Sequence, residues 1–169
     1  MTLSSTSSSE TLQVRCPASS EEIGMIRELF REYERSLGFD LRFQDFEREL
    51  AALPGAYAPP DGMLLLVTVP RGPVGCAGIR RIDEGVCELK RMYVRPEFRG
   101  RKIGRDLALR LIAGARRIGY AKMRLDTIGT MVEAIRLYES LGFRTISPYY
   151  HNPIPGAMFM ELDLSREQR

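Results

Sequence analysis

Four strand-like segments in the middle of the chain constrain the fold more than any other feature of the sequence. Three of them, Met63–Val69, Val74–Ile82 and Val86–Val94, are largely apolar and are separated by short turns containing glycine. Connections this short join antiparallel neighbours. The fourth segment, Lys122–Thr127, follows after an amphipathic helical pattern, and a strand–helix–strand unit is a right-handed crossover between parallel strands. The sequence therefore predicts a mixed, mostly antiparallel sheet.

Segments with helical spacing of apolar residues surround these strands. Ser19 and Glu22 form a capping-box pattern at the start of one helix, and Gly38 follows its last apolar residue. The other predicted elements are a short helix that includes Phe43 and Phe46 and stops at Pro54, two helices that end at Gly119 and Gly142, and strands at Leu12–Arg15, Arg144–Ile146 and Met158–Leu162. This alternation predicts an α/β domain with helices flanking a central sheet.

The length and composition fit one ordinary globular domain. The 169 residues are 44% hydrophobic, which is enough apolar material for a core without metal or disulfide support. Residues 1–11 are mostly polar and rich in Ser and Thr, and we expect a disordered tail there, followed by the domain at 12–169.

Charge and cysteine content narrow the classes of function. The net charge of +3 does not suggest a nucleic-acid binder, and no apolar run approaches the ~20 residues of a membrane span. Without a signal-peptide pattern, the expected compartment is the cytoplasm. The three cysteines form no Cys-x-x-Cys pair and His151 is the only histidine, so we expect neither a disulfide framework nor a metal site. A homodimer is a possible assembly.

A basic, glycine-containing loop lies between the third strand and the crossover helix. It consists of Arg99, Gly100, Arg101, Lys102, Ile103, Gly104 and Arg105. A helix N-terminus offers free backbone N–H groups and partial positive charge, and glycines let a ligand approach the backbone. These features predict a phosphate site, although a solvent-exposed basic helix start with turn glycines has the same sequence pattern.

Two motifs in order resemble the GCN5-related N-acetyltransferase (GNAT) superfamily. Val-x-Pro-x-x-Arg-Gly runs from Val94 to Gly100, and Ala-Ile-Arg-Leu-Tyr-Glu-Ser-Leu-Gly-Phe runs from Ala134 to Phe143. The resemblance implies a single GNAT-type domain whose sheet is splayed between the fourth and fifth strands. It also implies that acetyl-CoA lies in the splay, with its pyrophosphate on the basic loop. Its pantetheine arm would follow Met92, Tyr93 and Val94.

The loop departs from the family pattern at one position. The pattern is Arg/Gln-x-x-Gly-x-Gly/Ala, and Lys102 occupies the place of the first glycine. Its backbone N–H can still donate to a phosphate, and its side chain can reach one. Met131 stands where many relatives have asparagine, so a polar contact to the cofactor is expected to be missing.

The resemblance implies two catalytic residues, and each has a structural alternative. Tyr138 corresponds to a tyrosine near the cofactor sulfur, where a phenol can protonate the leaving thiolate. It is also a core aromatic candidate on the apolar face of its helix. Glu88 matches the catalytic glutamate of the histone-acetylating branch, so it is the candidate general base. Alternatively, it forms an ion pair with Lys90 or with a basic side chain on an adjacent strand.

The acceptor site is expected near Asp126, which contacts the substrate amine or ties down a loop. Phe43, Tyr149 and Tyr150 are candidate walls of the same pocket, although the tyrosines fit a packed turn equally well. The predicted function is transfer of an acetyl group from acetyl-CoA to a primary amine, of a small molecule or a peptide, by direct attack in a ternary complex. Two alternatives are a non-catalytic acyl-CoA-binding sensor or regulatory module and a binder of nucleic acid or acidic partners.

Overall fold

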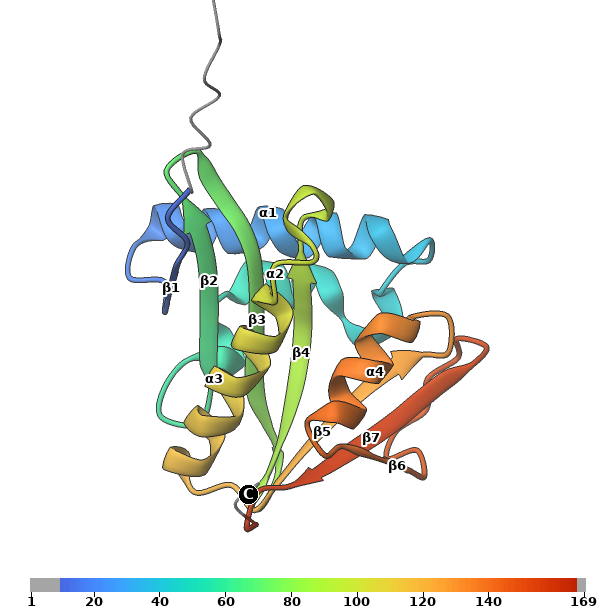
Figure 1. Ribbon diagram of the computed structural model, residues 1–169. Helices are drawn as coiled ribbons and strands as arrows, with labels where there is room; N and C mark the ends of the chain where they lie inside the picture. The colour runs from blue at the N-terminus through green and yellow to red at the C-terminus, as the bar shows by residue number, and fades with distance from the viewer. Residues whose placement is uncertain (1–9, 167–169) are drawn as a thin grey trace, which may run out of the picture.

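The computed structural model describes residues 10–166, which form a seven-stranded sheet with helices on both faces (Figure 1). The strands are β1 (Gln13–Arg15), β2 (Met63–Val69), β3 (Gly72–Asp83), β4 (Val86–Val94), β5 (Lys122–Ile128), β6 (Arg144–Ile146) and β7 (Ala157–Asp163). The helices are α1 (Ser20–Leu37), α2 (Phe46–Ala52), α3 (Ile103–Ile118) and α4 (Val132–Ser140), with short 3₁₀ turns η1 (Arg42–Gln44), η2 (Gly55–Tyr57) and η3 (Pro96–Phe98). Most of the expected tail, residues 1–9, lies outside the described residues.

The sheet has the order β1-β2-β3-β4-β5-β7-β6. Its strands pair antiparallel except for β4 and β5, which are parallel and are joined by the crossover helix α3. This arrangement confirms the predicted mixed sheet. It follows from the loop lengths, because tight turns leave β2, β3 and β4 no other way to pair.

The sheet opens between β4 and β5. The two strands pair at only three positions, ending with Glu88 opposite Arg124, and then diverge (Figure 1). In β4, Arg91 has a φ of 57°, and the pairing with β3 shifts between Cys76 and Gly78. Such a bulge bends and twists a strand, and it lies just beyond the point where β5 departs. The predicted splay between the fourth and fifth strands is confirmed.

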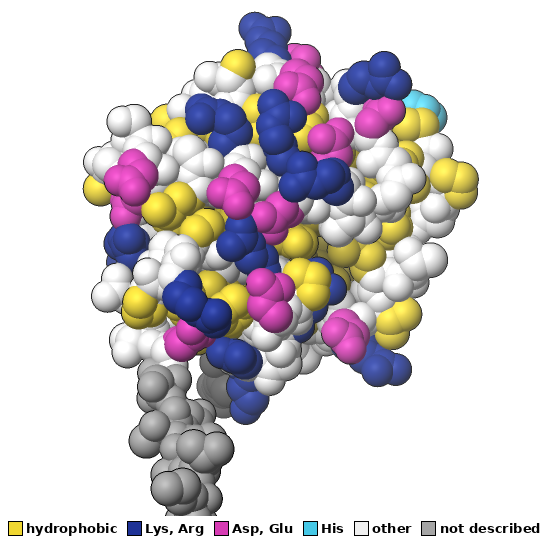
Figure 2. All heavy atoms as spheres, turned by 90° about the horizontal axis from the view of Figure 1, so that it is seen from above, with side chains coloured by type: hydrophobic (Ala, Val, Ile, Leu, Met, Phe, Trp, Pro, Cys, Tyr) yellow, Lys and Arg dark blue, Asp and Glu magenta, His cyan; other side chains and the backbone are white. Residues whose placement is uncertain are grey.

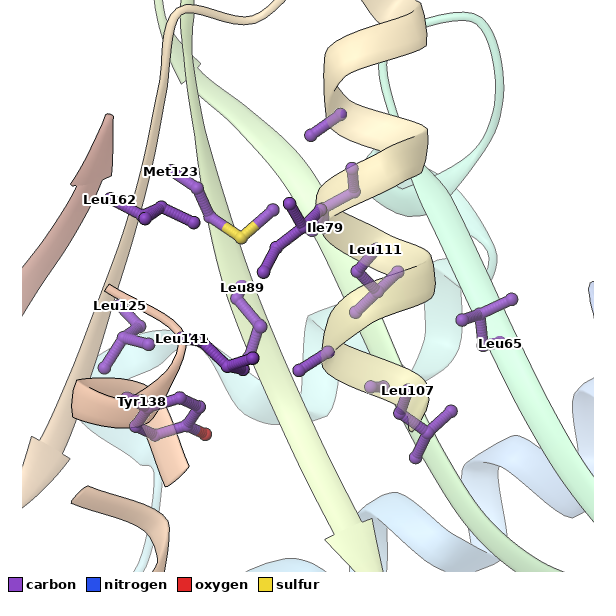
Figure 3. Packing of buried hydrophobic residues seen from close by; sticks show 14 of the residues in the cluster. Leu65, Ile79, Leu89, Leu107, Leu111, Met123, Leu125, Tyr138, Leu141 and Leu162 are labelled. Atoms are coloured by element: carbon purple, nitrogen blue, oxygen red, sulfur yellow. The ribbon is translucent and has the colours of Figure 1, made fainter. Parts of the chain in front are cut away.

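Two apolar layers hold the helices on the sheet. On one face, Leu107 and Leu111 of α3 and Leu141 at the C-terminal end of α4 pack in one cluster with Leu89 and Leu125 (Figure 3). On the other face, α1, α2 and η2 contribute a separate cluster that contains Ile26, Leu29, Phe30, Phe46, Leu50 and Tyr57. The two clusters hold helices on opposite faces of the sheet, and the diverging ends of β4 and β5 lie between these two apolar layers.

Local differences from the sequence predictions occur around α1 and α2. Ser19 caps α1 as predicted, but the Glu22 carboxylate accepts from the Ala18 N–H and from Arg15 instead of closing a reciprocal box. The predicted second helix is divided, because Asp45 has a φ of 57° between η1 and α2. Phe43 therefore lies in η1 and is 37% exposed, whereas Phe46 begins α2 and is buried.

Candidate active site

A cleft of about 730 Å³ fills the space where β4 and β5 diverge. One end lies at the start of α3, and the other lies between η1 and the loop that precedes β7. The β4 backbone from Leu89 to Val94 lines one wall, and β5 residues with α4 line the other. The cleft therefore results from the divergence of β4 and β5, and the sheet topology determines where the surrounding elements lie.

The basic loop forms the mouth of the cleft. Lys102 is the N-terminal cap of α3, has a φ of 60° in the left-handed region and makes no side-chain capping bond. The first helical bond of this turn runs from the Asp106 N–H to the Lys102 carbonyl, at 3.0 Å. The preceding N–H groups of Ile103, Gly104 and Arg105 have no acceptor within the helix. They lie at the cleft wall, where an anion can accept from them.

The loop side chains divide into those that face the cleft and one that does not. The cleft is lined by Arg99, Gly100, Lys102, Ile103, Gly104 and Arg105. Arg101 instead stacks over the Phe98 ring at 4.9 Å. A methyl group at Gly104 would lie 3.7 Å from Leu137 and 3.9 Å from Met92, so the glycine leaves open space beside the helix N-terminus. Free N–H groups, open space and nearby cations together fit the pyrophosphate of an acyl-CoA.

The backbone of β4 borders the cleft directly. Met92, Tyr93 and Val94 all line it, and β5 pairs with β4 only as far as Glu88. Peptide groups on this edge of β4 are therefore available to a ligand that lies along the strand. A ligand with amide groups along its length, such as a pantetheine arm, fits such an edge. Its amides can hydrogen-bond to the β4 backbone where no neighbouring strand pairs with it.

Tyr138 belongs both to the core and to the cleft. Its ring lies in the cluster beside Leu125 and Leu141 (Figure 3) and packs on Phe143 with centroids 5.6 Å apart, and its Oη lies 3.9 Å from the Met92 Sδ. The residue is only 7% exposed, and burial raises the pKa of its phenol above the usual value. The hydroxyl therefore stays protonated at neutral pH and can donate.

Glu88 has its carboxylate fully engaged. Arg80 of the adjacent strand β3 donates from Nε and Nη2 to Oε1, at 3.1 and 3.0 Å. Tyr149 donates to Oε2 at 2.6 Å. The side chain is 2% exposed, and Glu88 is not among the residues that line the cleft. The sequence alternative, an ion pair with an adjacent strand, is thus present, and the role of general base stays a prediction.

Asp126 faces the cleft across from Lys90. Its Oδ1 lies 3.3 Å from the Lys90 Nζ, and its Oδ2 accepts from Asn152 at 3.0 Å and from Tyr150. Burial raises the pKa of this carboxyl, but the Lys90 charge and the hydrogen bonds outweigh burial and lower it overall. Asp126 is therefore anionic at neutral pH. Its bonds to Tyr150 and Asn152 fit the expected anchor of a loop, and its role in binding the substrate amine stays a prediction.

Lys90 and Arg91 are two buried cations on the same stretch of β4. Burial lowers the pKa of Lys90, while Glu88 and Asp126 oppose that effect. Arg91 donates from Nε to Glu49 at 2.8 Å and lies over the Phe46 ring at 5.1 Å. Sequence reasoning placed neither cation in the acceptor site. The available signal was that Lys90 and Arg91 are adjacent basic residues inside a largely apolar strand that also carries Glu88.

The loop of residues 147–156 closes the inner end of the cleft. Tyr149 and Tyr150 stack on Phe159 with centroids 5.2 and 5.3 Å apart, and their hydroxyls reach Glu88 and Asp126. Phe43 from η1 and Asn152 line the cleft, whereas Tyr149 and Tyr150 are not among the lining residues. The expected packed turn is therefore present, and the role of the two tyrosines as walls of the acceptor pocket stays a prediction.

The basic residues do not form one exposed surface. Lys90 and Arg91 are buried, and Arg95 is bound by Glu28 and Glu32 of α1. Figure 2 shows Lys and Arg interspersed with Asp and Glu on the face seen from above. Among residues 10–166, no group of three His, Cys, Asp or Glu is arranged to hold a metal, and no described helix is long and apolar enough to cross a membrane.

Comparison with known proteins places the chain in a family. The acetyltransferase (GNAT) family model matches residues 23–143. An uncharacterised N-acetyltransferase of Schizosaccharomyces pombe is 41% identical over 148 residues, which cover 86% of this chain and 91% of that protein. N-acetylaspartate synthetase of Danio rerio is 34% identical over 110 residues, 64% of this chain and 39% of that protein.

Solved structures share the fold. The acetyltransferase YncA of Salmonella typhimurium, solved with its cofactor acetyl-CoA, matches with a TM-score of 0.64 and 22% identity over 94% of this chain and 96% of that chain. With the family match covering most of the described domain, the chain belongs to the GNAT acetyltransferase family. The resemblance noted in the motifs is confirmed.

Proposed function

We propose that this protein transfers an acetyl group from acetyl-CoA to a primary amine by direct attack of the amine on the thioester in a ternary complex. One observation carries the proposal. A single cleft contains the uncapped N-terminus of α3, the open edge of β4 and the Tyr138 hydroxyl. These are the anion site, the strand edge and the proton donor that an acyl-CoA thioester needs.

The cofactor's place follows from these features. Its pyrophosphate accepts from the N–H groups at the start of α3, with Lys102 and Arg105 adding positive charge. Its pantetheine arm follows Met92, Tyr93 and Val94, and a β4 N–H polarises the thioester carbonyl. Acetyl-CoA bound to the related fold of YncA supports this choice of cofactor.

The chemical step needs no covalent enzyme intermediate. The amine nitrogen forms a bond to the thioester carbonyl carbon, the C–S bond breaks, and the thiolate takes a proton from the Tyr138 hydroxyl. The amine loses one proton to water or a base when it is present as ammonium, and the proton released on forming the amide returns through water to Tyr138, which restores its hydroxyl. The name of the Danio rerio relative describes an acetylated amino-acid amine, which supports an amine acceptor.

The amine must be neutral to attack, and the nearby carboxylates differ in access. Glu88 is the sequence candidate for the base, but Arg80 and Tyr149 already bind its carboxylate. Among the described residues, Asp126 and Glu133 are the carboxylates that line the cleft. We assign amine binding to Asp126. Glu88 receives the amine's proton only through water or after Tyr149 moves.

The test is acetyl-CoA turnover with an amine panel, followed by free thiol release and by mass spectrometry of the acceptor. The panel spans amino acids, amino-acid amides, polyamines, arylalkylamines and peptides with free N-termini. Amine-dependent thiol release with a product 42 Da heavier is the expected result. If acetyl-CoA binds but no acceptor is acetylated, the chain is an acyl-CoA sensor and the enzyme proposal is wrong.

A further inference from the structure

The side-chain amide of Gln44 bridges two oppositely charged walls at the inner end of the cleft. Its Oε1 accepts from the Lys90 Nζ at 3.1 Å and from the Arg91 Nη1 at 2.8 Å. Its Nε2 donates to the Tyr150 Oη at 3.0 Å and lies 3.5 Å from the Asp126 Oδ2. Lysine and arginine only donate, so the atom that faces them must be the amide oxygen.

The Gln44 amide is an uncharged partner of groups that are ion-paired elsewhere. Lys90 pairs with Asp126 and Arg91 pairs with Glu49, and both cations also donate to the Gln44 oxygen, although hydrogen bonds between charged partners are roughly twice as strong as neutral ones. Asp126, which also accepts from Tyr150 and Asn152, meets the amide N–H at 3.5 Å. A ligand with a carboxylate in place of the oxygen and an ammonium in place of the N–H would match both walls better.

We infer that the acetyl acceptor is a small amine with a carboxylate beside it, such as a free α-amino acid, which binds in place of the Gln44 amide. The carboxylate accepts from Lys90 and Arg91. The amine donates to Asp126 and lies next to Tyr150. One carbon separates O and N in the amide and two separate them in an α-amino acid, so the two groups span similar distances. The claim that this ligand is the acetyl acceptor rests on the proposed function, whereas the claim that the ligand binds here does not.

The position of Gln44 permits this exchange. It is only half-buried and ends η1, one 3₁₀ turn in the segment between α1 and α2. The structure also disfavours other acceptors. A polyamine would bring a second positive charge toward Lys90 and Arg91, as would a peptide N-terminus followed by a basic residue, and such charges repel strongly where water is excluded.

The first experiment measures binding without catalysis. Free α-amino acids and their carboxamides are titrated into the protein saturated with coenzyme A, which cannot transfer an acetyl group. Replacing a charged acceptor by a neutral one should cost a factor of about ten or more. We expect at least one amino acid to bind tenfold more tightly than its own amide. If no amino acid binds, or if acids and amides bind equally, the inference is wrong.

Variants of Gln44 separate displacement from direct contact. Gln44→Glu places a carboxylate on Lys90 and Arg91 within the chain itself, and we expect it to weaken amino-acid binding at least tenfold. Gln44→Ala removes the competing amide, so binding should be retained or tightened. Loss of binding in Gln44→Ala would show that Gln44 is itself a ligand and would overturn the inference. Gln13→Glu, the same change on exposed β1, is the matched control.

Turnover separates this inference from the proposed function. If amines are acetylated with no preference for a carboxylate, the proposed enzyme activity is supported and the inferred class of acceptor is wrong. If amino acids bind selectively but no thiol is released, the inferred binding site is supported and the proposed enzyme activity is wrong. Lys90→Gln completes the set, because loss of its charge should reduce the acid-to-amide ratio in binding, whereas Lys122→Gln on the exposed side of β5 should not.

Discussion

Tyr138 shows how one side chain serves packing and chemistry together. Its ring is enclosed by the α3–α4 core, which fixes its position (Figure 3), and its hydroxyl lies beside Met92, which lines the cleft. Because burial raises the pKa of the phenol, the hydroxyl keeps its proton at neutral pH and can donate a hydrogen bond to a thiolate that forms next to it. The burial that stabilises the core therefore also keeps the Tyr138 hydroxyl protonated.

Tyr138→Phe tests this role with little change in packing. The ring stays and only the hydroxyl is lost, so we expect the melting temperature and coenzyme A affinity to change little. The value of kcat should fall by about 10- to 100-fold, near the low end for a lost acid, because a thiolate leaves readily. Steady-state rates across pH give the measurement. An unchanged kcat would assign Tyr138 to the core alone.

The sequence indicated positions that a motif or a hairpin marks, but not contacts that span the chain. Tyr138 and the loop residues other than Arg101 line the cleft, and Glu88 pairs with Arg80 of the adjacent strand, which was its structural alternative. The motifs did not reveal that Tyr149 binds Glu88, or that Gln44 meets Lys90, because these partners come from distant segments. A single sequence carries no signal for which long-range polar groups will meet when several buried ions compete for partners.

At the scale of elements, the start of α3 holds a residue in a conformation that suits glycine. Lys102 has a φ of 60°, where a side chain costs of order 1 kcal/mol. This is the position where the family pattern has glycine, so the departure is tolerated without changing the helix start. The helix N–H groups that the pattern serves remain available.

Lys102→Gly should therefore stabilise the folded chain slightly. Relief of the left-handed strain exceeds the added entropy of a glycine in the unfolded chain, and we expect a gain of about 0.5–1 kcal/mol. Coenzyme A affinity should stay the same or rise, as measured by calorimetry beside urea unfolding. Lys102→Ala is the control, because alanine keeps the strain. A large loss of affinity in both variants would make the lysine side chain the main phosphate contact.

The elements themselves were predictable to within a few residues, and two exceptions share a cause. The break between η1 and α2 occurs at Asp45, and the bulge in β4 occurs at Arg91, both with φ near 57°. Neither residue is a glycine, so the sequence carries no mark of the turn. At Arg91 the tertiary bonds to Glu49 and Gln44 hold the conformation, whereas at Asp45 the bonds are to nearby residues, for example from the Asp45 N–H to the Arg42 carbonyl.

At the scale of the whole molecule, the sheet consists of two parts joined by a short seam. Strands β1–β4 form one part and β5–β7 the other, and only three paired positions connect them (Figure 1). A ligand along the open edge of β4 that also contacts α4 would bridge both parts. Because it binds the folded chain alone, its binding energy adds directly to the free energy of unfolding.

Coenzyme A at about 100 times its dissociation constant should add about 2.7 kcal/mol to the free energy of unfolding, which corresponds to a rise of about 5–10 °C in melting temperature.

Gly104→Asp should abolish that rise, because a carboxylate at the start of α3 repels the pyrophosphate. The same carboxylate interacts favourably with the helix dipole, so the ligand-free variant should melt no lower than the wild type. A Cβ at Gly104 would make ordinary van der Waals contacts, 3.7 Å from Leu137 and 3.9 Å from Met92, so it displaces neither neighbour. Gly104→Asn matches the size without the charge and should keep more of the rise. If coenzyme A raises the melting temperature of Gly104→Asp by the full amount, the pyrophosphate does not bind at the start of α3, and the proposed path of the cofactor through the cleft is wrong.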